Sequence, residues 1–233
     1  MSDTRPRAID GLRIPALLPS AVADLLREQI ISGALAAGER LVETSLAEPF
    51  DVSRGPIREG LKLLVEEGLV VNLPRRGTYV TQLTAKDVRE IYDYRAAIES
   101  RAVRLAVAAV PTPEAVAELE EIVREIEEAA DRGDAQAARE LDLDFHGLLY
   151  QLAGNDRLLA AFRRLVPSLR LLNRSRYELF HSLREAPQEH WPIIEAIRRG
   201  DRALAESEID RHLEHAKEQL IAHIAGPEVE GAR

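Results

Sequence analysis

The sequence predicts a mainly α-helical protein in two parts, a small amino-terminal domain with a β-hairpin and a larger all-helical bundle. Apolar residues recur three or four positions apart through most of the 233 residues, which is the spacing of a buried helix face. Two short β-prone runs flank a turn at 74–77 and indicate the hairpin. The expected parts are a flexible arm at 1–19, a first domain at 20–83, a helical domain at 84–225 and a loose tail at 226–233.

Composition narrows the class of protein. Hydrophobic residues make up 45% and charged residues 30% of the chain, as in soluble globular proteins. The absence of cysteine excludes disulfides, thiolate metal sites and a cysteine nucleophile. Residues 1–20 contain no continuous apolar run, so we expect neither a secretory signal nor a membrane span, and a cytoplasmic location. Nearly all of the net charge of −9 falls in the second part, and the first part is close to neutral, so nucleic-acid binding would need a local basic patch in the first part.

The first domain is predicted to contain a helix-turn-helix. One amphipathic helix runs from Ser20 to about Gly33, and a short helix follows at 43–50. After a turn at Asp51, Ser53 is a suitable N-cap for the next helix, and Pro56 falls in its first turn, where a missing N–H costs nothing. Two helices joined by so tight a turn are typical of this arrangement.

The second of these helices presents two different faces. Cations recur every four residues along one face, at Arg54, Arg58 and Lys62. Apolar residues line another, at Ile57, Leu61 and Leu64. A solvated amphipathic helix would show the same pattern, but the hairpin that follows carries Arg75, Arg76 and Gly77 at its tip, where a loop can lie along a groove of DNA.

The second part consists of helices separated by Pro and Gly turns. Thr84 and Asp87 form a capping-box variant at the start of the first, and Pro167 should kink a later one. In the first helix, Arg95 falls inside an otherwise apolar stripe, and a buried cation needs a partner. Glu99, four residues on, could be that partner; an anionic ligand is the alternative.

Four residues of the bundle could bind a metal ion. Asp142 and His146, at i and i+4, project from one face of a helix, although this spacing often occurs without a metal. His190 and His212 lie on the apolar faces of two later helices. His181, His215 and His223 are expected at the surface, with His215 a possible alternate ligand to His212. Trp191 is expected in the core or in a cavity wall.

Several motifs occur in order and resemble the winged helix of GntR-type bacterial transcription regulators over residues 20–81. They are Leu46-Ala47, Val52-Ser53-Arg54, Pro56-Ile57-Arg58-Glu59, Gly68-Leu69-Val70 and Arg76-Gly77-Thr78-Tyr79-Val80. Departures from the usual pattern are Pro49, Asp51, Gly55 and Gly60, and each glycine should weaken its helix by about 0.5–1 kcal/mol relative to alanine.

Residues 84–224 resemble the FCD effector-binding domain of the FadR-like branch of that family. The motifs are Asp142-Leu143-Asp144-Phe145-His146, Ala153-Gly154-Asn155, Glu189-His190, Ala196-Ile197-Arg198-Arg199-Gly200-Asp201 and His212-Leu213. The resemblance implies that Asp142, His146, His190 and His212 hold a divalent metal. It also implies an effector site with Arg95, Glu99 and Asn155, although a role as a helix N-cap or turn residue explains Asn155 better than a ligand contact does.

The function expected from these observations is a homodimeric transcription regulator, a repressor, whose binding to operator DNA is controlled by a small carboxylate at the metal site. The DNA-contacting residues would be Ser53, Arg54, Pro56, Arg58, Arg75, Arg76 and Gly77. The ion could be Zn²⁺, Ni²⁺, Mn²⁺ or Fe²⁺, with Zn²⁺ expected in purified protein. Alternatives are a metal-dependent hydrolase, for which Asp144 points away from the Asp142/His146 face, and a metal sensor without an organic effector.

Overall fold

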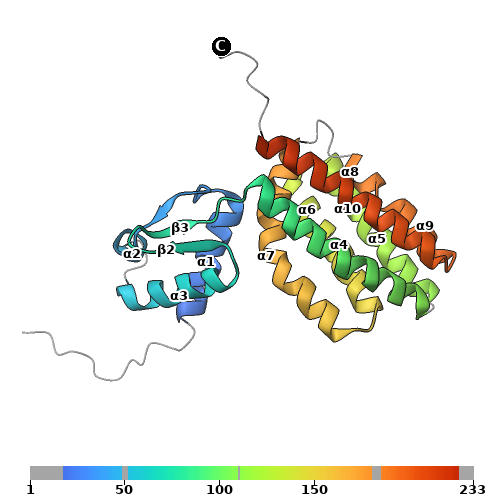
Figure 1. Cartoon of the computed structure of the whole chain (residues 1–233), viewed down its shortest axis with the longest axis horizontal. Helices are drawn as coiled ribbons and strands as arrows, with labels where there is room; N and C mark the ends of the chain where they lie inside the picture. The colour runs from blue at the N-terminus through green and yellow to red at the C-terminus, as the bar shows by residue number, and fades with distance from the viewer. Residues whose placement is uncertain (1–17, 49–51, 110, 180–184, 226–233) are drawn as a thin grey trace, which may run out of the picture. The chain divides into compact units, whose positions relative to one another are not determined.

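The computed structural model describes residues 18–48, 52–109, 111–179 and 185–225, which form two compact units (Figure 1). The first unit contains residues up to 66 together with 70–80, and the second contains 67–69 and the chain from 81 onward. The predicted arm up to residue 17, the turn at Asp51, Pro49, His181 and the predicted tail lie outside the described residues. The chain is mostly helical with one small sheet, so the predicted fold class is confirmed.

The first unit is a winged helix-turn-helix. Its elements are α1 (Leu18–Ser32), β1 (Arg40–Leu41), α2 (Glu43–Ala47), α3 (Arg54–Glu66), β2 (Val70–Leu73) and β3 (Gly77–Val80). The sheet is antiparallel with the order β1-β3-β2, and the β2–β3 hairpin is the predicted wing. The two-residue strand β1 was not predicted, because a strand this short carries no recognisable alternation.

One glycine sets how closely α1 and α3 pack in the first unit. A Cβ atom on Gly60 would lie 2.9 Å from the Val22 side chain and 3.1 Å from the Pro19 carbonyl oxygen. Gly60 is therefore required by the packing and is not simply a weak point in the helix. Gly55, the other glycine of α3, has only the Ser53 hydroxyl near its equivalent position, at 3.7 Å.

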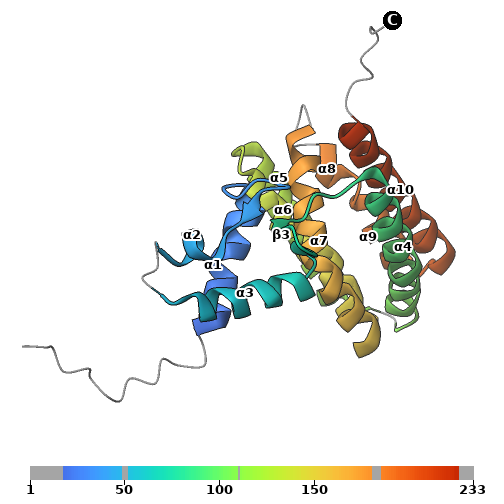
Figure 2. The same cartoon turned by 60° about the vertical axis from the view of Figure 1, so that its left-hand side comes forward.

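The second unit is entirely helical. Its helices are α4 (Ala85–Ala108), α5 (Pro113–Asp131), α6 (Ala135–Leu152), α7 (Asp156–Leu179), α8 (Glu185–Gln188), α9 (Trp191–Arg198) and α10 (Arg202–Ala225). Helices α4 and α10 lie side by side, and α6 packs against α4, α5 and α7 (Figure 2). The capping box at Thr84 and Asp87 is present as predicted, and Pro167 lies inside α7.

The core of the second unit surrounds the middle of α6. Phe145 and Leu149 of α6 are fully buried in one cluster with apolar residues of α4, α5, α9 and α10. Seven polar or charged side chains are buried among the described residues, and all seven belong to this unit. They are Arg95, Glu99, Asp142, His146, Asn173, His190 and His212. Burial of so many polar and charged side chains is unfavourable unless they pair with one another. Most of these side chains contact one another around Asp142 and the three buried histidines.

Candidate metal centre and DNA-binding surface

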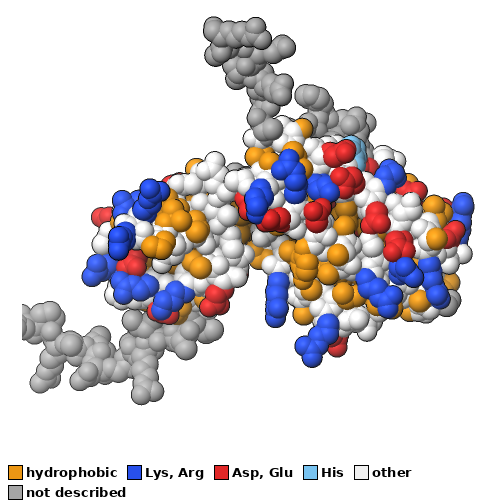
Figure 3. All heavy atoms as spheres, in the orientation of Figure 1, with side chains coloured by type: hydrophobic (Ala, Val, Ile, Leu, Met, Phe, Trp, Pro, Cys, Tyr) orange, Lys and Arg blue, Asp and Glu red, His pale blue; other side chains and the backbone are white. Residues whose placement is uncertain are grey.

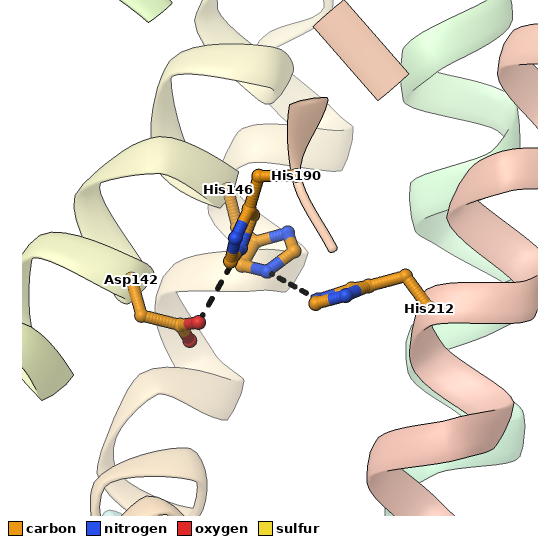
Figure 4. Close-up of side chains that lie close together, drawn as sticks. All are labelled: Asp142, His146, His190 and His212. Atoms are coloured by element: carbon orange, nitrogen blue, oxygen red, sulfur yellow. Dashed lines mark hydrogen bonds and ion pairs between the residues drawn. The ribbon is translucent and has the colours of Figure 1, made fainter. Parts of the chain in front are cut away.

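Three helices bring the predicted ligands together. Asp142 and His146 lie one turn apart on α6, His190 occupies the N-cap position of α9, and His212 lies on α10. Each of the four offers one potential ligand atom, and these atoms all lie within 4.8 Å of one another. The side chains are fully buried and point toward a common centre (Figure 4).

The three imidazole rings share one hydrogen-bonding pattern, in which Nδ1 faces an oxygen acceptor. Each Nδ1 atom has an oxygen acceptor, so Nδ1 carries the proton and Nε2 is left with its lone pair. The acceptors are Glu99 Oε1 for His146, the Pro187 carbonyl oxygen at 3.3 Å for His190, and Glu189 Oε2 at 3.1 Å for His212.

The Nε2 atoms face inward. His146 Nε2 lies 3.2 Å from His212 Nε2, and His190 Nε2 lies 3.4 Å from Asp142 Oδ1. Two unprotonated nitrogens cannot hydrogen-bond to each other, and burial lowers the pKa of His146, which keeps its ring neutral. Three imidazole nitrogens and one carboxylate oxygen form a set of ligands that suits a divalent metal ion. In metal-bound histidines the other ring nitrogen usually donates a hydrogen bond to an oxygen, as each Nδ1 does here. The residues fit such an ion.

Arg95 and Glu99 lie beside this centre. Arg95 Nε donates to Glu99 Oε2 at 3.0 Å, and Glu99 also accepts from His146 and from the Tyr150 hydroxyl, at 3.5 Å. Burial would raise the pKa of Glu99, but the positive charge of Arg95 and the contact with His146 outweigh it and lower that pKa to about 2. Glu99 is therefore ionised and joins the Arg95 cation to His146, one of the candidate metal ligands.

Beside the four candidate ligands, Arg95 and Asn173 have buried atoms without a hydrogen-bond partner. Both Nη1 and Nη2 of Arg95 are of this kind. Asn173, which the sequence analysis did not single out, donates from Nδ2 to Asp142 Oδ2 at 3.2 Å, and its own Oδ1 is unpartnered. Since a carboxylate only accepts, this contact fixes the orientation of the amide. Asn173 lies in a leucine-rich stretch of α7, so its sequence context gives no sign of a site.

Asn155 has a structural role. Its Oδ1 accepts from the backbone N–H groups of Arg157 and Leu158, at 3.1 and 3.2 Å, at the start of α7. This is the N-cap alternative considered for this residue.

The remaining histidines differ from one another. His215 is half exposed and contacts Glu189, whereas His223 is exposed and His181 lies outside the described residues. Trp191 is partly buried, and its ring N–H donates to Glu127 at 2.9 Å.

The predicted DNA-binding arginines of α3, Arg54 and Arg58, are exposed in the first unit, and Pro56 is half-buried. Arg54 is the first residue of α3, directly after Ser53, and Pro56 lies in the first turn. Arg58 donates two hydrogen bonds to Glu43 of α2, at 2.9 and 2.8 Å, and this contact lowers the pKa of Glu43. Arg58 thus ties the two helices of the motif together.

The wing carries its own basic residues. Arg75 and Arg76 are exposed at the tip, where Arg75 has φ 64° and Gly77 has φ 108°. Both values lie in the left-handed region, so the turn is tight and brings backbone to the surface. Lys and Arg side chains outnumber acidic ones on the face of the first unit that Figure 3 shows. This is the local basic patch that an acidic chain needs in order to bind DNA.

No helix among the described residues is long and apolar enough to cross a membrane.

Comparison with known proteins agrees with this arrangement. Residues 18–80 match the family model for bacterial regulatory proteins of the gntR family, and residues 90–215 match the FCD domain. The uncharacterised HTH-type transcriptional regulator YdhC of Bacillus subtilis (strain 168) is 36% identical over 84% of this chain and 87% of its own. The gluconate operon transcriptional repressor of Bacillus licheniformis is 34% identical over 78% and 76%. Among solved structures, E. coli McbR/YncC superimposes with a TM-score of 0.72 at 25% identity, covering 87% of this chain and 96% of that one.

Proposed function

The chain belongs to the GntR family of bacterial regulatory proteins and carries an FCD domain, and on this basis we propose that it is a repressor controlled by a small organic acid at a metal ion. It is a DNA-binding transcription regulator, and its FCD domain is the effector-binding part. The observation that carries the proposal is the buried set of one carboxylate and three inward Nε2 atoms beside an arginine with two unpartnered Nη atoms.

The metal would be held by Asp142, His146, His190 and His212. A divalent ion there would supply a Lewis acid to an oxygen atom of the effector. Zn²⁺ is the ion we expect in purified protein, with Ni²⁺, Mn²⁺ and Fe²⁺ as the other candidates for three nitrogens and one oxygen.

The effector would be an acid because of Arg95. Its buried Nη1 and Nη2 offer two parallel donors, which suit a carboxylate, while Glu99 keeps the guanidinium charged and oriented. Asn173 Oδ1 is a buried acceptor that lacks a donor. A hydroxyl group on the effector would satisfy it, so hydroxycarboxylic acids are the class we favour. Gluconate, which names the operon regulated by one relative, is the first member to test.

DNA binding would use α3 and the wing of two chains. In the proposed homodimer, Arg54 and Arg58 face bases or phosphates, Ser53 and Pro56 hold the start of α3 against the backbone, and the wing reaches the adjacent groove. The wing contacts would come from Arg75, Arg76 and Gly77. Effector binding would shift the population of dimers toward one that presents its two α3 helices poorly to the half-sites. A coupling of about 1–3 kcal/mol is sufficient for a useful switch.

A metal-dependent hydrolase is the second candidate because the same ligand set can activate water. The relatives are regulators, which favours a role without catalysis. Asp144, the nearest additional carboxylate in sequence, does not face the four candidate ligands. It lines a cavity of about 280 Å³ between α5, α6 and α7, together with Leu143 and Phe162. Ester turnover that a chelator abolishes would support the hydrolase.

The decisive experiment combines native mass spectrometry, elemental analysis and gel-shift titration of the full chain. We expect a dimer with about one Zn²⁺ per chain, and operator affinity that falls when gluconate is added to metal-loaded protein but not to chelator-treated protein. His146→Ala combined with His190→Ala should remove the metal. Retention of stoichiometric metal by that variant would refute the site. Operator affinity that follows Zn²⁺ and ignores every acid would support the metal-sensor alternative.

A further inference from the structure

A series of hydrogen bonds leads from the proposed metal centre through Glu189, in the turn before α9, to exposed side chains of α10. His212 Nδ1 lies 3.1 Å from Glu189 Oε2, and His215 Nδ1 lies 2.5 Å from Glu189 Oε1. On its other side, His215 Nε2 lies 3.0 Å from Gln219 Nε2. One carboxylate therefore bridges a buried histidine and an exposed one that is a single turn away on the same helix.

The chemistry of these groups fixes the direction of each hydrogen bond. An ionised Glu189 can only accept, so both imidazole rings donate to it from Nδ1. The amide N–H of Gln219 donates to His215 Nε2. With both of its nitrogens engaged, His215 offers no lone pair to a metal. His212, in contrast, has Nε2 directed inward, 3.2 Å from His146 Nε2.

The solvent exposure of the side chains increases from His212 through Glu189 to His215. The side chain of His212 is fully buried, whereas Glu189 is 13% and His215 48% exposed. The other two rings are held differently, His146 by the fully buried Glu99 and His190 by a backbone carbonyl. Glu189 is thus the outer-shell carboxylate that solvent reaches, and the orientation of His212 depends on a contact close to the surface.

We propose that Glu189 is a positioning residue of the metal centre and that His215 acts through it. Glu189 holds His212 in the tautomer that directs Nε2 at the ion and makes the ring more basic. His215, held by Gln219, keeps the carboxylate in place. The inference rests on the proposed metal site and assigns His215 a supporting role instead of that of an alternate ligand.

The test measures Zn²⁺ affinity by chelator competition and the visible absorption of the Co²⁺-loaded protein. Loss of an outer-shell partner of a metal ligand weakens affinity by about 10- to 100-fold, which is the effect we expect for Glu189→Ala. Glu189→Gln keeps the size and an acceptor oxygen but loses the charge, so it should recover part of the affinity. Glu218→Ala is the matched control, since Glu218 is an exposed carboxylate on the neighbouring face of α10.

A double-mutant cycle separates the two roles of His215. If His215 acts through Glu189, His215→Ala weakens Zn²⁺ binding in the wild-type background and has no further effect in the Glu189→Ala background. An equal effect in both backgrounds would show that His215 acts independently of Glu189 and would overturn the proposal.

The proposal can fail separately from the metal site. Unchanged Zn²⁺ affinity and an unchanged Co²⁺ spectrum in Glu189→Ala and Glu189→Gln would refute it while wild-type binding still supports the four ligands. Wild-type protein that binds no metal would refute the site itself. Circular dichroism of each metal-free variant checks folding, and if Glu189→Ala does not fold, the nearly isosteric Glu189→Gln decides.

Discussion

Arg95 and Glu99 form a fully buried ion pair one turn apart on α4, with Nε 3.0 Å from Oε2. The sequence left two partners open for this arginine, the glutamate or an anionic ligand. The ion pair uses only the Nε atom of the guanidinium, so the two partners do not exclude each other. Glu99 accepts from Nε, and Nη1 and Nη2 stay available for an anion.

Arg95→Lys should uncouple the effector from the operator. Lysine keeps a positive charge near Glu99 but lacks the second donor edge, and losing hydrogen bonds to a charged group costs about 1.5–3 kcal/mol. We expect gluconate affinity, measured by calorimetry at saturating Zn²⁺, to fall at least tenfold, with operator affinity unchanged in its absence. Arg95→Ala is the harsher change, because it leaves the Glu99 carboxylate buried without its cation and should cost about 3–5 kcal/mol of stability. Equal gluconate affinity in Arg95→Lys would contradict the assignment.

Arg54→Ala should lower operator affinity by about 1–3 kcal/mol if it reads a base edge. Arg58→Ala should also loosen α2 from α3, because it removes both hydrogen bonds to Glu43. Glu43→Gln is the control, since it weakens the pair but leaves the arginine able to reach DNA. Gel-shift titration at fixed salt measures the operator affinity of the three variants. Unchanged affinity in Arg54→Ala would show that Arg54 is not part of the DNA interface.

The two glycines of α3 should respond oppositely to alanine. Gly60→Ala places a methyl group 2.9 Å from Val22, so we expect it to destabilise the first unit by about 1–3 kcal/mol, as overpacking does. The methyl group of Gly55→Ala would meet only the Ser53 hydroxyl, at an ordinary van der Waals distance of 3.7 Å, so this change should stabilise the helix by up to about 1 kcal/mol. Urea denaturation of the two variants gives the comparison, and a neutral Gly60→Ala would mean that α1 moves away at little cost.

The capping box of α4 predicts a pH-dependent stability. Thr84→Ala should cost about 0.5–2 kcal/mol. Hydrogen bonds from Thr84 lower the pKa of Asp87 below its usual value of 3.8. Because the folded-state pKa is the lower one, the contribution of Asp87 is present above about pH 4 and disappears as the pH falls through the folded pKa. The stability difference between wild type and Asp87→Asn should therefore be constant from pH 7 to pH 5 and shrink in more acidic solution.

Asn173→Leu should weaken both metal and hydroxy-acid binding. It removes the donor to Asp142, for which we expect about a 10- to 100-fold loss of Zn²⁺ affinity. At saturating Zn²⁺, the wild type should prefer lactate over propionate, and the variant should lose part of that preference. An unaltered ratio would leave Asn173 as a partner of Asp142 only.

The parts of the structure that follow from local pattern were predictable, and those that depend on distant contacts were not. The apolar stripes, the cap at Thr84 and the hairpin around Gly77 are written within a few residues of chain. Helical spacing paired Asp142 with His146, and position on apolar faces singled out His190 and His212. The resemblance to known regulators then implied that all four hold one ion.

The roles of Asn173, Glu189 and Gly60 were not predicted, and the reason is the same for all three. Each acts on a residue at least 23 positions away, namely Asp142, His212 and Val22, and a single sequence does not reveal such pairs. Gly60 was predicted to destabilise its helix, because helix propensity compares glycine with alanine in an isolated helix. It takes no account of Val22, which the alanine methyl group would contact too closely.

A metal ion at the candidate centre would change the stability of the second unit. His146 and His212 are 66 positions apart, on helices that belong to different stretches of the chain. An ion held between them would close a long loop, as a disulfide does, and would stabilise the folded unit in proportion to the logarithm of free metal over its dissociation constant. In a chain without cysteine, this cross-link is independent of thiol redox chemistry. The amount of folded regulator in a cell would then follow metal supply even before any effector binds.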